Sequence, residues 1–231
     1  MSKPVKDLRN MTFEEYENLP TLGLDDAFEF TCKACGKCCK YNRNDLLLTS
    51  YDVYRIAKYF GRTTEQIITR YCEIYIGDTS NLPIARIIPQ PPHGSCPLML
   101  KNGKCAVHQS KPVVCRVYPL ARLFKADGGG SRYYFNGASC SHEPKPITVR
   151  EWLADVASDE AEEAGTLWRD VLTTLLPMVQ PDKIKLKETR EQAFQLLIGG
   201  LYMAYDIEQP FTPQLQRNFE MIKTVLSDAI I

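Results

Sequence analysis

The chain has 231 residues, of which 44% are hydrophobic, and its 28 basic side chains balance its 28 acidic ones. This length and composition predict a folded protein with a sizeable core, in one large domain or two small ones. A balanced charge gives no long-range attraction to nucleic acid or to an anionic membrane, so neither is expected as a partner. Without a long apolar run or a signal-peptide core at the N-terminus, we expect a cytoplasmic protein.

The first part of the chain predicts a short leader, followed by helices and strands. Residues 1–30 are expected to form the leader, with one short helix near 13–19. Thr49 and Asp52 match a capping box that opens a helix, and Gly61 ends the helical apolar pattern. The elements expected here are helices over 47–61 and from residue 63 or 64 onward, and strands over 73–77 and 85–89.

The middle of the chain is rich in turn signals. "NGK" at 102–104 predicts a turn between short strands at 98–100 and 105–107. "SKPVVCRVYP" predicts a short helix with Pro112 in its first turn, where the missing N–H costs least. "LARLF" and "RYYFN" flank "DGGGS" and predict a β-hairpin.

The last part of the chain contains no cysteine from Thr148 onward and reads as amphipathic helices. Thr148 and Glu151 form a capping-box pattern that opens the first helix, which could break near Gly165. A second helix is expected over 187–209, and a third from Thr212, the expected N-cap. The whole predicts an α+β protein with a leader (1–30), a small cysteine-rich metal-binding core with short strands and helices (31–146) and a helical C-terminal extension (147–231).

Nine cysteines carry the chemistry, and the odd number in an expected cytoplasmic chain argues against a disulfide framework. "CKACGKCC" at 32–39 holds four of them, in a C-x2-C-x2-C spacing that lets one loop present three thiolates. Zinc takes four such ligands in a closed site, and bacterial ferredoxins use this spacing for a [4Fe–4S] cluster. A metal ion or cluster is therefore the expected partner, with [4Fe–4S] favoured over zinc. Adjacent Cys38 and Cys39 are not expected to bind one ion without a strained turn. The sequence therefore does not decide between one metal centre and two.

Three stretches, "CKACGKCC", "SCPLMLKNGKCAVHQSKPVVCRVYP" and a later "SC", resemble the YkgJ-type cysteine-cluster family, described as a zinc- or iron-chelating domain. The resemblance covers residues 30–142, with Lys111 where the family more usually has Arg. It implies a cofactor-binding role for Arg116, which follows a predicted ligand. The expected metal ligands are Cys32, Cys35, Cys38, Cys39, Cys96, Cys105, Cys115 and Cys140.

Three functions follow as hypotheses. The first is an iron–sulfur protein that is redox-linked or accessory to another enzyme. The second is a structural zinc protein that serves as an interaction platform and docks a protein partner through its C-terminal helices. The third and weakest is a protein-modifying enzyme, because a similar domain occurs in bacterial flagellin lysine N-methylases, although no cofactor-binding motif supports it here.

Several residues near the cysteines are expected to be bystanders. Cys72 lies outside the family pattern, and we expect it to be a small buried side chain and not a ligand. His108 and His142 are expected to pack or to make a hydrogen bond near the ligands, and His93 to be exposed. The loop cations either are solvated or lower the pKa of nearby thiols; they are Lys33, Lys37, Lys40 and Arg43.

Overall fold

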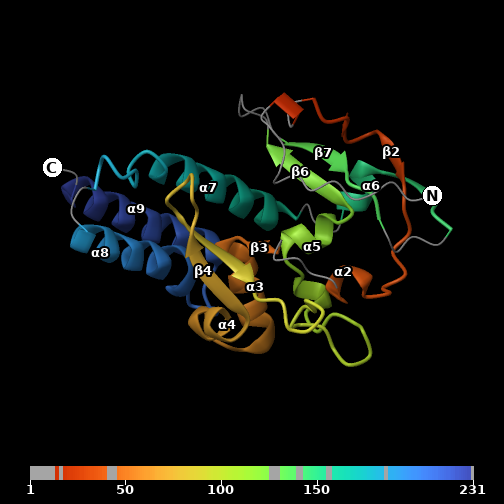
Figure 1. Cartoon of the computed structure of the whole chain (residues 1–231), viewed down its shortest axis with the longest axis horizontal. Helices are drawn as coiled ribbons and strands as arrows, with labels where there is room; N and C mark the ends of the chain where they lie inside the picture. The colour runs from red at the N-terminus through yellow and green to blue at the C-terminus, as the bar shows by residue number, and fades with distance from the viewer. Residues whose placement is uncertain are drawn as a thin grey trace.

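The computed structural model has the expected α+β fold, with the long C-terminal helices at one end, the strands β2, β6 and β7 at the other, and β3 and β4 between them (Figure 1). The cysteine loop lies on the sheet side, close to α5 (Val113–Val117). The structure describes residues 14–15, 18–40, 46–124, 131–138, 143–154, 158–184 and 187–229.

A three-stranded antiparallel sheet and two helices form the centre of the molecule. The sequence predicts both helices and two of the strands, whereas the third strand, Leu47–Leu48, was predicted as the start of the first helix. The strands are β3 (Leu47–Leu48), β5 (Pro83–Ile87) and β4 (Cys72–Ile76), paired in that order. Helix α3 (Ser50–Phe60) follows the Thr49 capping box and ends at Gly61, whose φ of 58° suits glycine. A second capping box, of Thr63 and Gln66, opens α4 (Thr64–Tyr71).

The second sheet region is built around the predicted hairpin. Strands β6 (Leu120–Phe124) and β7 (Ser131–Phe135) pair antiparallel, and β1 (Thr21–Leu22) adds to the other edge of β7. A separate ribbon pairs β2 (Ala27–Glu29) with β8 (Pro146–Thr148). The predicted leader therefore contributes two strands to the fold. Of its predicted helix at 13–19, residues 14–15 are helical and residues 18–19 form a turn and a bend, while 13, 16 and 17 lie outside the described residues.

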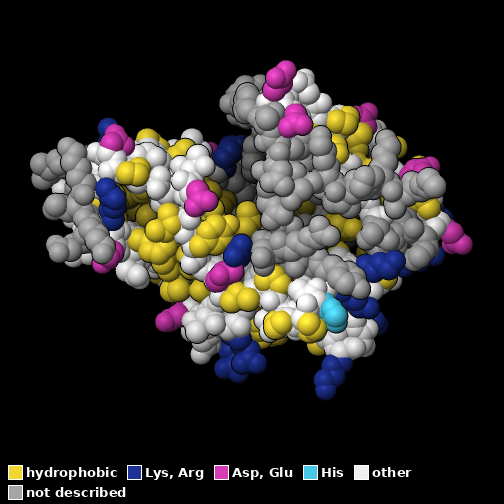
Figure 2. Space-filling model, viewed as in Figure 1, with side chains coloured by type: hydrophobic (Ala, Val, Ile, Leu, Met, Phe, Trp, Pro, Cys, Tyr) yellow, Lys and Arg dark blue, Asp and Glu magenta, His cyan; other side chains and the backbone are white. Residues whose placement is uncertain are grey.

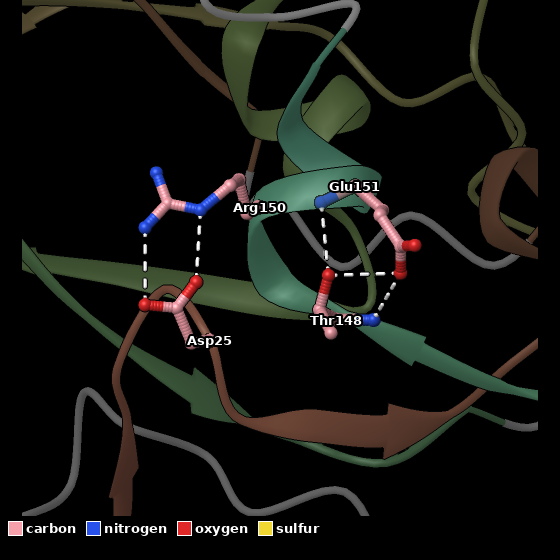
Figure 3. Close-up of polar contacts among 4 residues, drawn as sticks. All are labelled: Asp25, Thr148, Arg150 and Glu151. Atoms are coloured by element: carbon pink, nitrogen blue, oxygen red, sulfur yellow. Dashed lines mark hydrogen bonds and ion pairs between the residues drawn. The ribbon is translucent and has the colours of Figure 1, made fainter.

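Helix α6 (Val149–Leu153) begins directly after β8 at the predicted capping box (Figure 3). The backbone N–H and the hydroxyl of Thr148 both donate to the Glu151 carboxylate. The Arg150 guanidinium donates to both carboxylate oxygens of Asp25, at 2.9 and 3.1 Å, which ties the start of α6 to the turn before β2. Both side chains are exposed, so this pair orients the helix more than it stabilises the fold.

The C-terminal helices differ from the prediction at three places, of which the first two concern α7 and α9. The predicted break at Gly165 is wrong: α7 (Asp159–Leu175) runs through this residue, whereas α6 ends at Leu153 and α7 begins after its own N-cap, Ser158. A glycine costs an exposed helix only about 1 kcal/mol, which packing of the apolar face can offset. The prediction that Thr212 is the N-cap of α9 (Phe211–Ala229) is wrong, because Thr212 lies within the helix, which already begins at the fully buried Phe211.

Helix α8 (Lys187–Ile198) leads into one π-helical turn (Gly199–Met203), where the helix predicted over 187–209 ends. Helix α8 contacts β5, and α9 contacts α7, α8 and the π-helical turn. One large core, the first core, joins the central sheet, α3 and α4 to these C-terminal helices. It crosses the predicted boundary at residue 147, so the C-terminal helices and part of the cysteine-rich region bury their apolar faces together. A smaller second core lies under the other sheets; it consists of Phe28, Phe30, Val117, Leu120, Tyr133, Val149 and Leu153.

The face in Figure 2 carries hydrophobic side chains gathered over β4 and the neighbouring helices. Ile76 at the end of β4 and Leu176 after α7 are among the exposed large apolar residues. Across the described ranges, we find no helix long and apolar enough to cross a membrane.

Candidate metal centre

The cysteine loop turns at Gly36, which has a φ of 69° and is buried against the "NGK" turn. A Cβ added at Gly36 would collide with the carbonyl oxygen of Gly103. The backbone N–H groups of Cys39 and Lys40 donate to the Gly36 carbonyl and start the single turn α2 (Lys37–Lys40). Only glycine can combine this backbone conformation with so close an approach, so Gly36 fixes where Cys38 and Cys39 stand.

The Cys96 and Cys105 segments pack directly against this turn. The Cys96 N–H donates to the Cys39 carbonyl at 2.7 Å, and the Ser95 hydroxyl donates to the Lys40 carbonyl at 3.4 Å. The predicted hairpin around "NGK" is present as one isolated bridge between Met99 and Cys105. Backbone hydrogen bonds thus bring residues far apart in sequence to the second half of the loop.

Helix α5 brings the next thiol, Cys115, and is fastened to α3 by Asp52. The Asp52 carboxylate accepts the Val113 N–H at 2.8 Å while it also caps its own helix. Asp52 is buried, and burial raises the pKa of its carboxyl against the opposing effect of these hydrogen bonds. On its other side, α5 packs Val117 into the second core, where the Trp152 indole N–H donates to the Val117 carbonyl.

Cys38, Cys39, Cys96, Cys105 and Cys115 act on one another electrostatically, and we refer to these five as the thiol cluster. A hydrogen bond from Cys39 lowers the pKa of Cys38, and the same contact raises the pKa of Cys39. Burial is the main cause that raises the pKa of the others, to about 11 for Cys96 and further for Cys115. Without a metal, most of these thiols therefore hold their protons at neutral pH, and metal binding would release them.

The adjacent pair is arranged differently from the sequence expectation. The Cys38 and Cys39 Sγ atoms lie 3.9 Å apart. Two thiolates on one tetrahedral zinc, each at about 2.3 Å from the metal, stand about 3.8 Å apart. The separation is compatible with both sulfurs on one ion, and the choice between one centre and two stays a prediction.

The donor chemistry of the thiol cluster fits a soft or borderline metal, because thiolates are the ligands that zinc and iron–sulfur clusters prefer. Within the described ranges, however, no three His, Cys, Asp or Glu side chains already converge at a metal-binding geometry. The eight described cysteines are all free thiols. Binding would therefore draw the cluster side chains inward around the metal.

The other predicted ligands stand apart from the thiol cluster or cannot be placed. Cys32 is exposed, and Cys35 packs against the second core. Cys140 lies outside the described residues. Cys72 is buried, as predicted. Its pKa is raised to about 12, mainly by burial and to a smaller extent by the charge of Cys96.

Lys111, a cation outside the loop-based prediction, acts on the thiol cluster. Lys111 lowers the pKa of Cys38 and of His108 and opposes the burial effect at Cys105. Lys33 instead pairs with Glu143 at 3.3 Å, on the surface. Arg116 is half-buried in α5 beside Cys115, and its cofactor role stays a prediction. In the sequence, the only indication that Lys111 acts on the thiols is that the family motif has a basic residue at this position.

The histidines contribute little to the site. His93 and His108 are both exposed, as predicted for His93, whereas His108 was expected to pack or to make a hydrogen bond near the ligands. His142 and Arg43 lie outside the described residues.

The comparisons with known proteins agree with the donor chemistry. A family model named CxxCxxCC, "putative zinc- or iron-chelating domain", matches residues 31–151, which is just over half of the chain. No curated protein and no solved structure matches the chain. The match covers the cysteine loop, the three later cluster thiols and Lys111. The chain therefore belongs to the CxxCxxCC family of zinc- or iron-chelating domains.

Proposed function

We propose that the protein binds a metal centre through its thiol cluster and that this centre is an iron–sulfur cluster, redox-linked or accessory to another enzyme. The observation that carries the proposal is the meeting of thiols from three separate segments: the loop turn α2, the Cys96–Cys105 segment and α5. Four thiolates satisfy either a [4Fe–4S] cluster or a zinc ion, and the C-x2-C-x2-C spacing of the loop, which bacterial ferredoxins use, favours the iron–sulfur cluster. Cys32, Cys35 and Cys140 are further candidate ligands in the loaded protein.

The cations around the site support a reducible centre. Thiolate-bound clusters carry negative charge, and nearby positive charge makes them easier to reduce. Lys111 supplies such a charge close to Cys38 and Cys105, and we propose that Arg116 supplies another.

A structural zinc site is the second candidate, and the Cys38–Cys39 geometry favours it. Their separation of 3.9 Å is close to that of two ligands on one zinc ion. In this form, the protein would be an interaction platform, and α9 would offer the exposed Met221 and Val225, one helical turn apart, to a protein partner.

Purification without oxygen, followed by metal analysis and a visible spectrum, distinguishes the two candidates. An iron–sulfur centre requires brown protein with iron and acid-labile sulfide. The zinc alternative requires colourless protein with stoichiometric zinc and loss of fold on chelation. Protein that contains neither metal and keeps its fold would contradict both.

A further inference from the structure

We propose that Asp52 is a positioning residue for the metal centre: its buried carboxylate fastens the helix that carries Cys115 to the N-terminus of α3. This inference rests on the proposed function, and it adds a residue that is not a thiol and lies 63 positions before the ligand it positions.

The Asp52 carboxylate has partners on two elements. Its Oδ2 accepts from the backbone N–H and from the hydroxyl of Thr49, both at 2.9 Å, and completes the capping box of α3. Its Oδ1 accepts the Val113 N–H at 2.8 Å. Only 1% of the residue is exposed, so an acceptor removed here cannot be replaced by bulk water.

The bond to Val113 has a specific effect on α5. Val113 is the first residue of this short helix, and its N–H has no partner within the helix. The N-cap, Pro112, makes no side-chain capping bond, so the carboxylate of Asp52 takes the place of a local cap. A helix of five residues has little stability of its own, so its position depends on such contacts.

A second contact from α3 reaches the same segment. The Arg55 guanidinium donates from Nη2 to the Gln109 carbonyl at 2.8 Å, between Cys105 and Cys115. Asp52 and Arg55 thus hold the segment between two cluster thiols from adjacent turns of one helix. The Asp52 contact is the buried one, so its loss is expected to matter more.

The test follows metal release to a chelator from protein purified without oxygen, at a temperature where circular dichroism shows each variant folded. Asp52→Asn keeps only one acceptor oxygen, although both Thr49 and Val113 donate to this side chain. We expect this variant to release the metal about tenfold faster, an effect typical of residues that orient metal ligands. Val113→Pro removes the same bond from the other side, at a first helical position that accepts proline. If this bond carries the effect, the double variant releases metal no faster than the faster single variant.

Two capping variants serve as matched controls. Thr49→Ala weakens the α3 cap but leaves the Asp52–Val113 bond, and Gln66→Ala weakens the equivalent cap of α4. Both should lower the melting temperature and keep the wild-type release rate. Asp52→Asn with a wild-type rate, or Thr49→Ala with an equal acceleration, would overturn the role of Asp52. Wild-type protein that contains no metal would overturn the proposed function itself, and this inference with it.

Discussion

The two halves of "CKACGKCC" each contain two cysteines and one lysine but have different surroundings. The second half, with Cys38 and Cys39, lies against Cys96 and Cys105 and belongs to the thiol cluster. In the first half, Cys32 is exposed and Cys35 packs against the second core. Gly36 separates the halves and fits closely against the Gly103 carbonyl. The segments that pack against the loop therefore give its cysteines different surroundings, which their spacing does not show.

Serine substitutions should show the largest effect. We expect Cys96→Ser and Cys115→Ser to abolish metal retention, because each removes a ligand that lies within the thiol cluster. Cys32→Ser should retain most of the metal, and Cys72→Ser all of it, since Cys72 is a buried bystander. Metal content per chain, measured after anaerobic gel filtration, checks this order. Equal loss in Cys32→Ser and Cys96→Ser would show that the whole loop closes around the metal.

Gly36→Ala should weaken the centre next most strongly. The left-handed backbone costs a non-glycine residue about 1–2 kcal/mol, and the added Cβ also collides with the Gly103 carbonyl. Gly103→Ala is the matched control, because its φ of 79° is equally strained but its Cβ would meet no atom. We expect both variants to melt earlier and only Gly36→Ala to lose metal readily. Similar metal loss in both would mean that the close approach at Gly36 is unimportant.

Thiol reactivity should separate exposed and buried cysteines in the metal-free protein. Cys38 is exposed and its lowered pKa keeps more of it as thiolate, so it should be alkylated first and reach its maximal rate at lower pH than a free cysteine. Cys72, with its pKa raised to about 12, should react last and still accelerate at strongly alkaline pH. Mass spectrometry of peptides after iodoacetamide pulses measures this order. The account fails here if the loaded protein reacts at Cys38 as fast as the metal-free protein.

Lys111→Met should have the smallest effect. Loss of this cation raises the pKa of Cys38 and Cys105, so protons compete better with the metal. We expect roughly threefold weaker binding near neutral pH, and the deficit should shrink as pH rises. Lys111→Arg keeps the charge and should bind like wild type in chelator-competition titrations. A deficit that does not depend on pH would point to lost packing instead.

Local signals predicted much of the fold. The capping boxes at Thr49, Thr63 and Thr148 and the hairpin of β6 and β7 could be anticipated, because neighbouring residues determine them. The start of α9 could not, since burial of Phe211 against Tyr51, Tyr54 and Tyr205 depends on tertiary packing.

The candidate site was predictable only in part. The cysteine pattern indicated a metal and the family, which the family match confirms. The division of the loop at Gly36, the proximity of Lys111 and the second hydrogen bond of Asp52 all depend on contacts between segments far apart in sequence. Asp52 was recognised as a cap, but no local pattern shows that its other oxygen reaches α5.

X-ray absorption spectroscopy at the iron and zinc edges, on wild-type protein purified without oxygen, tests the central claim most directly. The account predicts a first shell made of sulfur, with a neighbouring iron shell if the centre is an iron–sulfur cluster, or four sulfurs at about 2.3 Å if it is zinc. A first shell of nitrogen and oxygen, or protein that folds with no bound metal, would contradict it.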